Sequence, residues 1–112
     1  MEKSNLELSN ILMNILNDNF IIDYFLVNNQ NVITFRAVNK NKKGKDYKRY
    51  IIVNNQILEI NKNVKTYTYS FNGIARKGCK NIMELTYKIE DAIYELNINT
   101  FKGKFIEEYI EI

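Results

Sequence analysis

The stretch of residues 32–60, VITFRAVNKNKKGKDYKRYIIVNNQILEI, decides the fold. Residues 32–38 alternate between apolar and polar side chains, which is the pattern of a half-buried β-strand. Its inward positions are Ile33, Phe35 and Ala37, and its outward positions are Thr34 and Arg36. A lysine-rich loop follows, and residues 47–53 return as a second strand. An Asn-Asn pair then predicts a turn before a short strand at residues 57–60.

Two further segments extend this sheet in both directions. Residues 20–27 form a dense apolar run interrupted by Asp23, and the Asn-rich residues 28–31 predict a tight turn. Residues 64–71 alternate, which places Tyr67, Tyr69 and Phe71 on one face. Short connections between consecutive strands allow only antiparallel pairing, so we expect a meander.

Each end of the chain carries a helix signal. Ser4 and Glu7 form a capping box that predicts a helix over about residues 5–17. Its expected buried stripe is Leu8, Ile11, Leu12, Ile15 and Leu16. A second capping box, Asn81 to Glu84, begins the other helix. The expected buried stripe of that helix is Ile82, Leu85, Ile89, Ala92, Ile93 and Leu96.

These elements predict one α+β domain spanning residues 1–112. We expect an N-terminal helix, an antiparallel meander of four to five strands, and a C-terminal helix packed on the same sheet face. Residues 100–112 fit either a short helix or a last strand.

Composition excludes most catalytic chemistry. The 112 residues contain no histidine and one cysteine, Cys79, which removes the usual general base and zinc sites. The carboxylates Glu90, Asp91 and Glu95 fit a solvated helix face better than a metal site. We therefore predict no enzymatic activity, no cofactor and no metal. No apolar run is long enough to span a membrane, and we see no secretion signal, so we expect a cytoplasmic protein in a bacterial cell.

The loop at residues 73–80, GIARKGCK, resembles a phosphate-binding loop only in the spacing of its two glycines. Cys79 stands where the lysine is needed, Lys80 comes one position late, and Asn81 replaces the Ser or Thr that ligates magnesium. We expect no nucleotide hydrolysis. The loop's basic residues beside a helix start still fit an anion contact. The same basic surroundings should lower the pKa of the Cys79 thiol.

Alternating aromatic residues leave two interpretations open. Tyr67, Tyr69 and Phe71, with Tyr47 or Tyr50, fit a platform on which nucleic-acid bases stack. They also fit the sheet face that a helix covers, which we favour.

Charge placement gives the one lead to function. Residues 36–80 carry twelve basic and two acidic side chains, a net charge of +10 inside a chain of net charge +3. A patch of this sign can meet phosphates or an acidic protein surface, although lysines also guard hairpin tips against aggregation. The predicted partner-binding or nucleic-acid-binding residues are Lys40, Lys42, Lys43, Lys45, Lys48, Arg49, Arg76, Lys77 and Lys80.

Two functions fit a small domain of this kind. The first is a non-enzymatic inhibitor or adaptor that binds a protein or nucleoprotein partner through the basic segment. Its size and its composition, rich in residues with AT-rich codons, are typical of phage or mobile-element anti-defence proteins, including anti-CRISPR proteins. The alternative is a nucleic-acid-binding accessory or regulatory protein.

Overall fold

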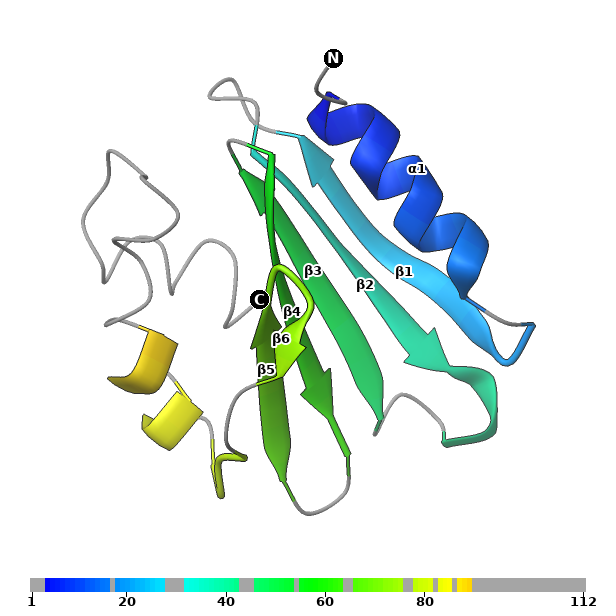
Figure 1. Ribbon diagram of the computed structural model, residues 1–112. Coiled ribbons are helices and arrows are strands. Elements are labelled where there is room, and N and C mark those ends of the chain that lie inside the picture. Colours follow the sequence, from blue (N-terminus) through cyan, green and yellow to red (C-terminus); the bar gives the residue numbers. More distant parts are fainter. Residues whose placement is uncertain are drawn as a thin grey trace.

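A computed structural model describes residues 4–16, 18–27, 32–42, 46–53, 55–63, 66–75, 78–81, 83–85 and 87–89. It shows a helix followed by an antiparallel sheet, as expected (Figure 1). The sheet order is β1-β2-β3-β4-β5-β6, so each strand pairs with its neighbours in the sequence. The α+β class and the antiparallel meander are therefore confirmed.

The first helix, α1 (Asn5–Ile15), begins at the predicted cap. The Glu7 backbone N–H donates to Ser4 Oγ at 3.1 Å, and Ser4 Oγ donates to Glu7 Oε1 at 3.3 Å. The buried stripe differs from the predicted one, because Ile11 and Ile15 are 40% and 72% exposed. The residues packed against the sheet are Leu8, Leu12, Met13 and Leu16.

The main strands are β1 (Phe20–Val27), β2 (Ile33–Asn39), β3 (Tyr47–Val53), β4 (Gln56–Lys62) and β5 (Tyr67–Phe71). A short 3-10 helix, η1 (Lys40–Lys42), follows β2. The pairing of β1 with β2 is interrupted once, between Ile22 and Tyr24, where Asp23 forms a β-bulge.

A sixth strand, β6 (Ile74–Ala75), was not predicted. It folds back on β5 through Asn72 and Gly73, whose φ angles are 50° and 84°. Two positive φ angles in a two-residue turn suit Asn-Gly, because both residues tolerate the left-handed region. The Asn-Gly pair was the available sequence signal for this hairpin.

Both faces of the sheet are covered by apolar clusters. On one face, α1 packs over the cluster Ile33, Phe35, Tyr50 and Ile52. On the other, Cys79, Leu85 and Ile89 join the cluster that contains Ile51, Val53, Leu58, Ile60 and Phe71. Successive residues of a strand point to opposite faces, so Ile51 and Ile52 belong to different layers. Figure 1 shows α1 and the helical turns near residue 85 on either side of the sheet.

This arrangement corrects the prediction that both helices cover the same face. The residues that indicate the second helix, 83–85 and 87–89, are helical and lie on the face opposite α1. The physical reason is that β3 carries apolar side chains on both faces, Tyr50 and Ile52 on one and Ile51 and Val53 on the other, so each face needs its own cover. The predicted stripe residues Ile82, Ala92, Ile93 and Leu96, and the tail at 100–112, lie outside the described residues.

Candidate functional site

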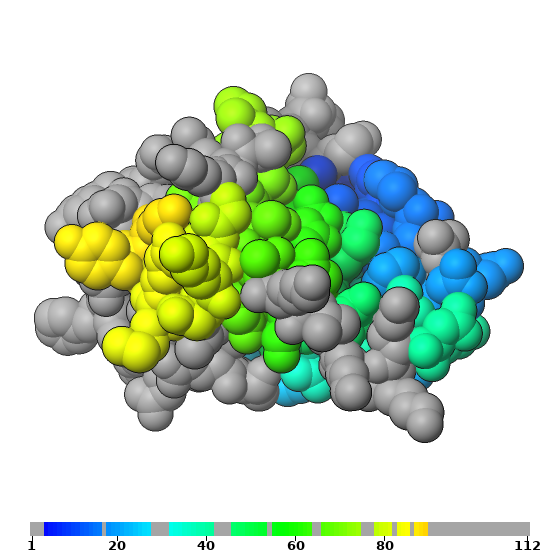
Figure 2. Space-filling model, turned by 90° about the horizontal axis from the view of Figure 1, so that it is seen from below, coloured from blue at the N-terminus to red at the C-terminus, as the bar shows by residue number. Residues whose placement is uncertain are grey.

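The meander brings three described lysines, Lys40, Lys62 and Lys80, to one end of the sheet. Tyr47 at the start of β3 pairs with Lys62 at the end of β4, and Lys62 pairs with Tyr67 at the start of β5. Tyr67 in turn forms a β-bridge with Cys79. The connection after β2 and the segment at residues 78–80 therefore lie at the same end, which we call the basic end. Figure 2 looks onto the molecule from this side.

The predicted binding residues occupy different environments. Lys40, in η1, and Lys80 are exposed, and Lys48 is half-buried on β3. Lys42 ends η1, and its side chain is not described. The other predicted residues outside the described part of the chain are Lys43, Lys45, Arg76 and Lys77.

Arg49 does not belong to the predicted surface. It is 1% exposed, and its Nη1 donates to Thr34 Oγ1 at 3.3 Å. Its guanidinium lies 5.4 Å from the centroid of the Tyr24 ring, and burial lowers the pKa of Arg49. An arginine held inside the sheet packing cannot reach a partner. The sequence held a signal for this position. Arg49 is two residues before Ile51 and four before Val53, so all three side chains lie on the same, buried face of β3.

A row of cations and tyrosine rings runs across the strands at the basic end. Arg36 lies 5.7 Å from the centroid of the Tyr47 ring. Lys62 lies 5.8 Å from the same centroid and 5.7 Å from that of Tyr67. Burial, and then the neighbouring Tyr67, raise the pKa of Tyr47. These rings therefore hold cations of the same chain instead of forming an open platform for bases.

Arg36 is also held from the side of β1. Its Nε and Nη2 donate to the two carboxylate oxygens of Asp23 at 2.9 and 2.7 Å. This bidentate geometry, led by the hydrogen bonds to Asp23, raises the pKa of Arg36. Arg36 and Lys62 contribute to the positive charge of residues 36–80 but were not among the predicted binding residues. The strand register links them, because Lys62 lies opposite both Tyr47 and Tyr67, and Arg36 is two residues before the β2 partner of Tyr47.

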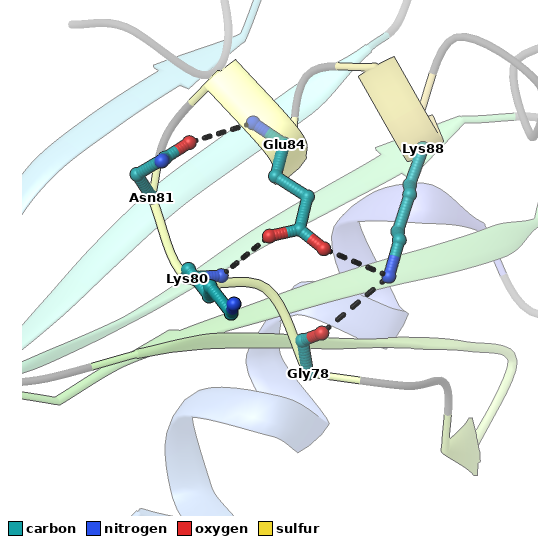
Figure 3. A network of polar contacts seen from close by, with 5 residues as sticks. All are labelled: Gly78, Lys80, Asn81, Glu84 and Lys88. Atoms are coloured by element: carbon teal, nitrogen blue, oxygen red, sulfur yellow. Dashed lines mark hydrogen bonds and ion pairs between the residues drawn. The ribbon is translucent and has the colours of Figure 1, made fainter.

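The expected anion contact at the second helix start is filled by the chain itself (Figure 3). The Glu84 backbone N–H donates to Asn81 Oδ1 at 2.9 Å, and the Lys80 N–H donates to Glu84 Oε2 at 2.9 Å. Lys88 Nζ lies 3.3 Å from Glu84 Oε1 and donates to the Gly78 carbonyl at 3.5 Å. The Lys80 N–H, and then Lys88, lower the pKa of Glu84. The Asn81 cap is confirmed, while the Glu84 carboxylate accepts from the Lys80 N–H instead of the Asn81 N–H and stands where phosphate was considered.

Two other candidates are resolved by burial. Cys79 is 1% exposed, and burial raises the pKa of its thiol, which contradicts the expected lowering. Phe71 is buried in the core, and Tyr67 and Tyr69 pack against the same cluster, which supports the packing interpretation of this trio. Tyr50 lies on the opposite face, where it stacks on Phe35 with ring centroids 4.9 Å apart.

Among the described residues, no three His, Cys, Asp or Glu side chains are grouped so that they could hold a metal ion. Glu90, Asp91 and Glu95 lie outside that part of the chain. Within the described residues, no helix is both long and apolar enough to cross a membrane.

The fold and the site thus define a small α+β domain built on an antiparallel meander, with a basic end. Comparison of this chain with family models, curated proteins and solved structures finds no match.

Proposed function

We propose that this chain is a non-enzymatic inhibitor or adaptor that docks on an anionic surface of a protein or nucleoprotein partner. The observation that carries this proposal is the gathering of Lys40, Lys62 and Lys80 at the basic end through the Tyr47–Lys62–Tyr67–Cys79 pairings. Basic residues gathered at one end of a domain attract an anionic partner and steer its approach.

The same proposal includes an origin in a phage or mobile element, a place in the bacterial cytoplasm and an anti-defence role of the anti-CRISPR kind. These parts rest on size and composition alone.

Binding of a nucleic-acid backbone is the second candidate function. The cations over Tyr47 and Tyr67 favour contacts to phosphates over stacking on bases, because the ring faces are already engaged. This candidate therefore predicts binding to duplexes at least as tight as binding to single strands.

The test compares a random-sequence DNA duplex, the matching single strand and poly-glutamate as probes across a salt series. The test variant combines Lys40→Ser with Lys80→Ser, because both side chains are exposed. Its control combines Asn10→Asp with Gln56→Glu, which changes the net charge equally. Asn10 is exposed on α1, and Gln56 is at the opposite end of β4 from Lys62.

We expect the lysine variant to weaken binding and the control to leave it nearly unchanged. For a duplex, the log–log salt slope should flatten by about 0.9 for each lost phosphate contact. Binding of poly-glutamate without binding of DNA would favour the protein partner. A native chain that binds none of the three probes at low salt, or a control that weakens binding as much as the lysine variant, would contradict the proposal.

A further inference from the structure

Strand β1 leaves an apolar edge open in the described sheet. It is eight residues long, FIIDYFLV, and pairs with β2 on one side only in that sheet. Four of its large apolar side chains are exposed: Ile21 (48%), Ile22 (39%), Phe25 (44%) and Val27 (48%). Edge strands are commonly protected by charged residues, and an apolar edge of this length is a template for another strand.

The one charge on β1 is directed toward its own sheet. Asp23 sits in the bulge, and both carboxylate oxygens accept hydrogen bonds from Arg36. The bulge confines the irregular pairing to the first half of the strand. The second half, from Tyr24 to Val27, pairs without interruption with β2. This half is regular and uncharged.

The backbone of this second half has groups that face outward. In β2, the Asn39 N–H donates to the Asp46 carbonyl on the β3 side, so alternate residues of β2 bond to β3 and to β1. Tyr24 and Leu26 lie opposite residues 36 and 34, which are β2 residues that bond to β1. The N–H and C=O groups of Tyr24 and Leu26 therefore point toward β2. Those of Phe25 and Val27 point toward the open edge.

We propose that this edge binds a second copy of the chain, with the two β1 strands antiparallel across a two-fold axis at Phe25. Opposite residues of an antiparallel pair share a sheet face, so this register sets Phe25 against Phe25 and Tyr24 against Leu26. These pairs are apolar or aromatic, and the next pair on each side, Val27 against Asp23 at the bulge, forms the margin of the interface. An aromatic pair at the centre adds to the strand pairing.

The available area fits a weak dimer. Large side chains expose on the order of 200 Å² when free, and exposures of 39–48% leave on the order of 80–100 Å² on each of the four residues. In this register the contact is made by Phe25 and Val27 with the partly buried Tyr24 and Leu26, which together offer roughly 300 Å² on each copy. Two copies then bury roughly 600 Å², the size of a weak, transient contact. We expect a reversible dimer with a dissociation constant on the order of 0.1–1 mM.

This interface is separate from the basic end, so it does not depend on the proposed function. Sedimentation of the native chain from about 5 to 500 µM tests it directly. Phe25→Lys should weaken the dimer at least tenfold, because two like charges then meet at the axis. Ile74→Lys, at a 62% exposed apolar position on β6, should change it less than threefold. A native chain that remains monomeric, or equal effects of the two lysines, would overturn the proposal.

Oxidative cross-linking then tests the register. Phe25→Cys places two thiols opposite each other, where antiparallel Cα atoms lie about 5.5 Å apart and a disulfide can form. Ile21→Cys is a matched control of similar exposure on the same strand, but its two copies would lie more than 20 Å apart in this register. At a concentration where the native chain is dimeric, we expect faster dimer cross-linking with Phe25→Cys. Equal rates would contradict the two-fold axis at Phe25.

Discussion

Ile51 and Ile52 provide a direct test of the two-sided core. They are consecutive residues of β3, both are fully buried, and they belong to the clusters on opposite faces. Replacing either by alanine removes three carbon atoms from a packed environment. If only one face were covered, one of the two side chains would lie in solvent, and its loss would cost little.

The expected cost follows from the burial. Each buried carbon contributes about 0.8 kcal/mol of transfer free energy, so three contribute about 2.4 kcal/mol. The cavity that remains raises this to about 3–4 kcal/mol for each substitution. A domain of this size is stable by roughly 5–15 kcal/mol, so each single variant should still fold at low temperature.

Urea denaturation followed by circular dichroism measures both variants. With a slope near 2 kcal/mol per M, each substitution should lower the midpoint by roughly 1.5–2 M. Ile74→Ala is the control, because Ile74 is 62% exposed and should change the free energy of unfolding by less than about 0.5 kcal/mol. A cost below about 1 kcal/mol for either Ile51→Ala or Ile52→Ala would refute the two-sided arrangement.

Two further predictions concern ionisation. Burial, and then the hydrogen bond that Tyr50 donates to Glu59, raise the pKa of Tyr50 above its unfolded value near 10, so its contribution to stability is complete below pH 10 and is lost as the pH rises further. Tyr50→Phe should therefore lose less stability than the native chain between pH 9 and 11 in urea titrations, and an equal loss would contradict this. The buried Cys79 thiol should react with a disulfide reagent at least about tenfold more slowly in the native chain than in urea, and equal rates would place it at the surface.

Much of the fold was readable from local patterns. The Ser4 and Asn81 capping boxes and the alternation in β2 and β5 predicted elements that the structure confirms. The covering of both faces was also signalled, since Tyr50 to Val53 is a continuous apolar run, which is typical of a strand buried on both sides. The alternating sequence of β2, taken alone, indicates one buried face, and for that reason both helices were expected on that face.

The candidate site was less predictable. Arg49 was predicted as a binding residue because of its charge. Its spacing of two residues from Ile51 indicates instead that it points into the protein. The shared position of Lys40 and Lys80 depends on the Tyr67–Cys79 bridge, a contact between segments that no local pattern specifies. The position of Glu84, by contrast, was signalled locally by the capping-box pattern. Its carboxylate turns back to the helix start and accepts a hydrogen bond from the Lys80 N–H, where an external anion was considered.

The bulge at Asp23 has a consequence for how this chain can change length. Ile22 pairs with Ala37, and Tyr24 pairs with the next residue of β2, Arg36, so Asp23 is an additional residue with no partner position of its own. Deleting Asp23 would leave every other pair of β1 and β2 in its present register, whereas deleting a neighbouring residue would shift side chains between faces. Position 23 is therefore where this strand can lose one residue and keep its pairing, at the cost of the carboxylate that binds Arg36.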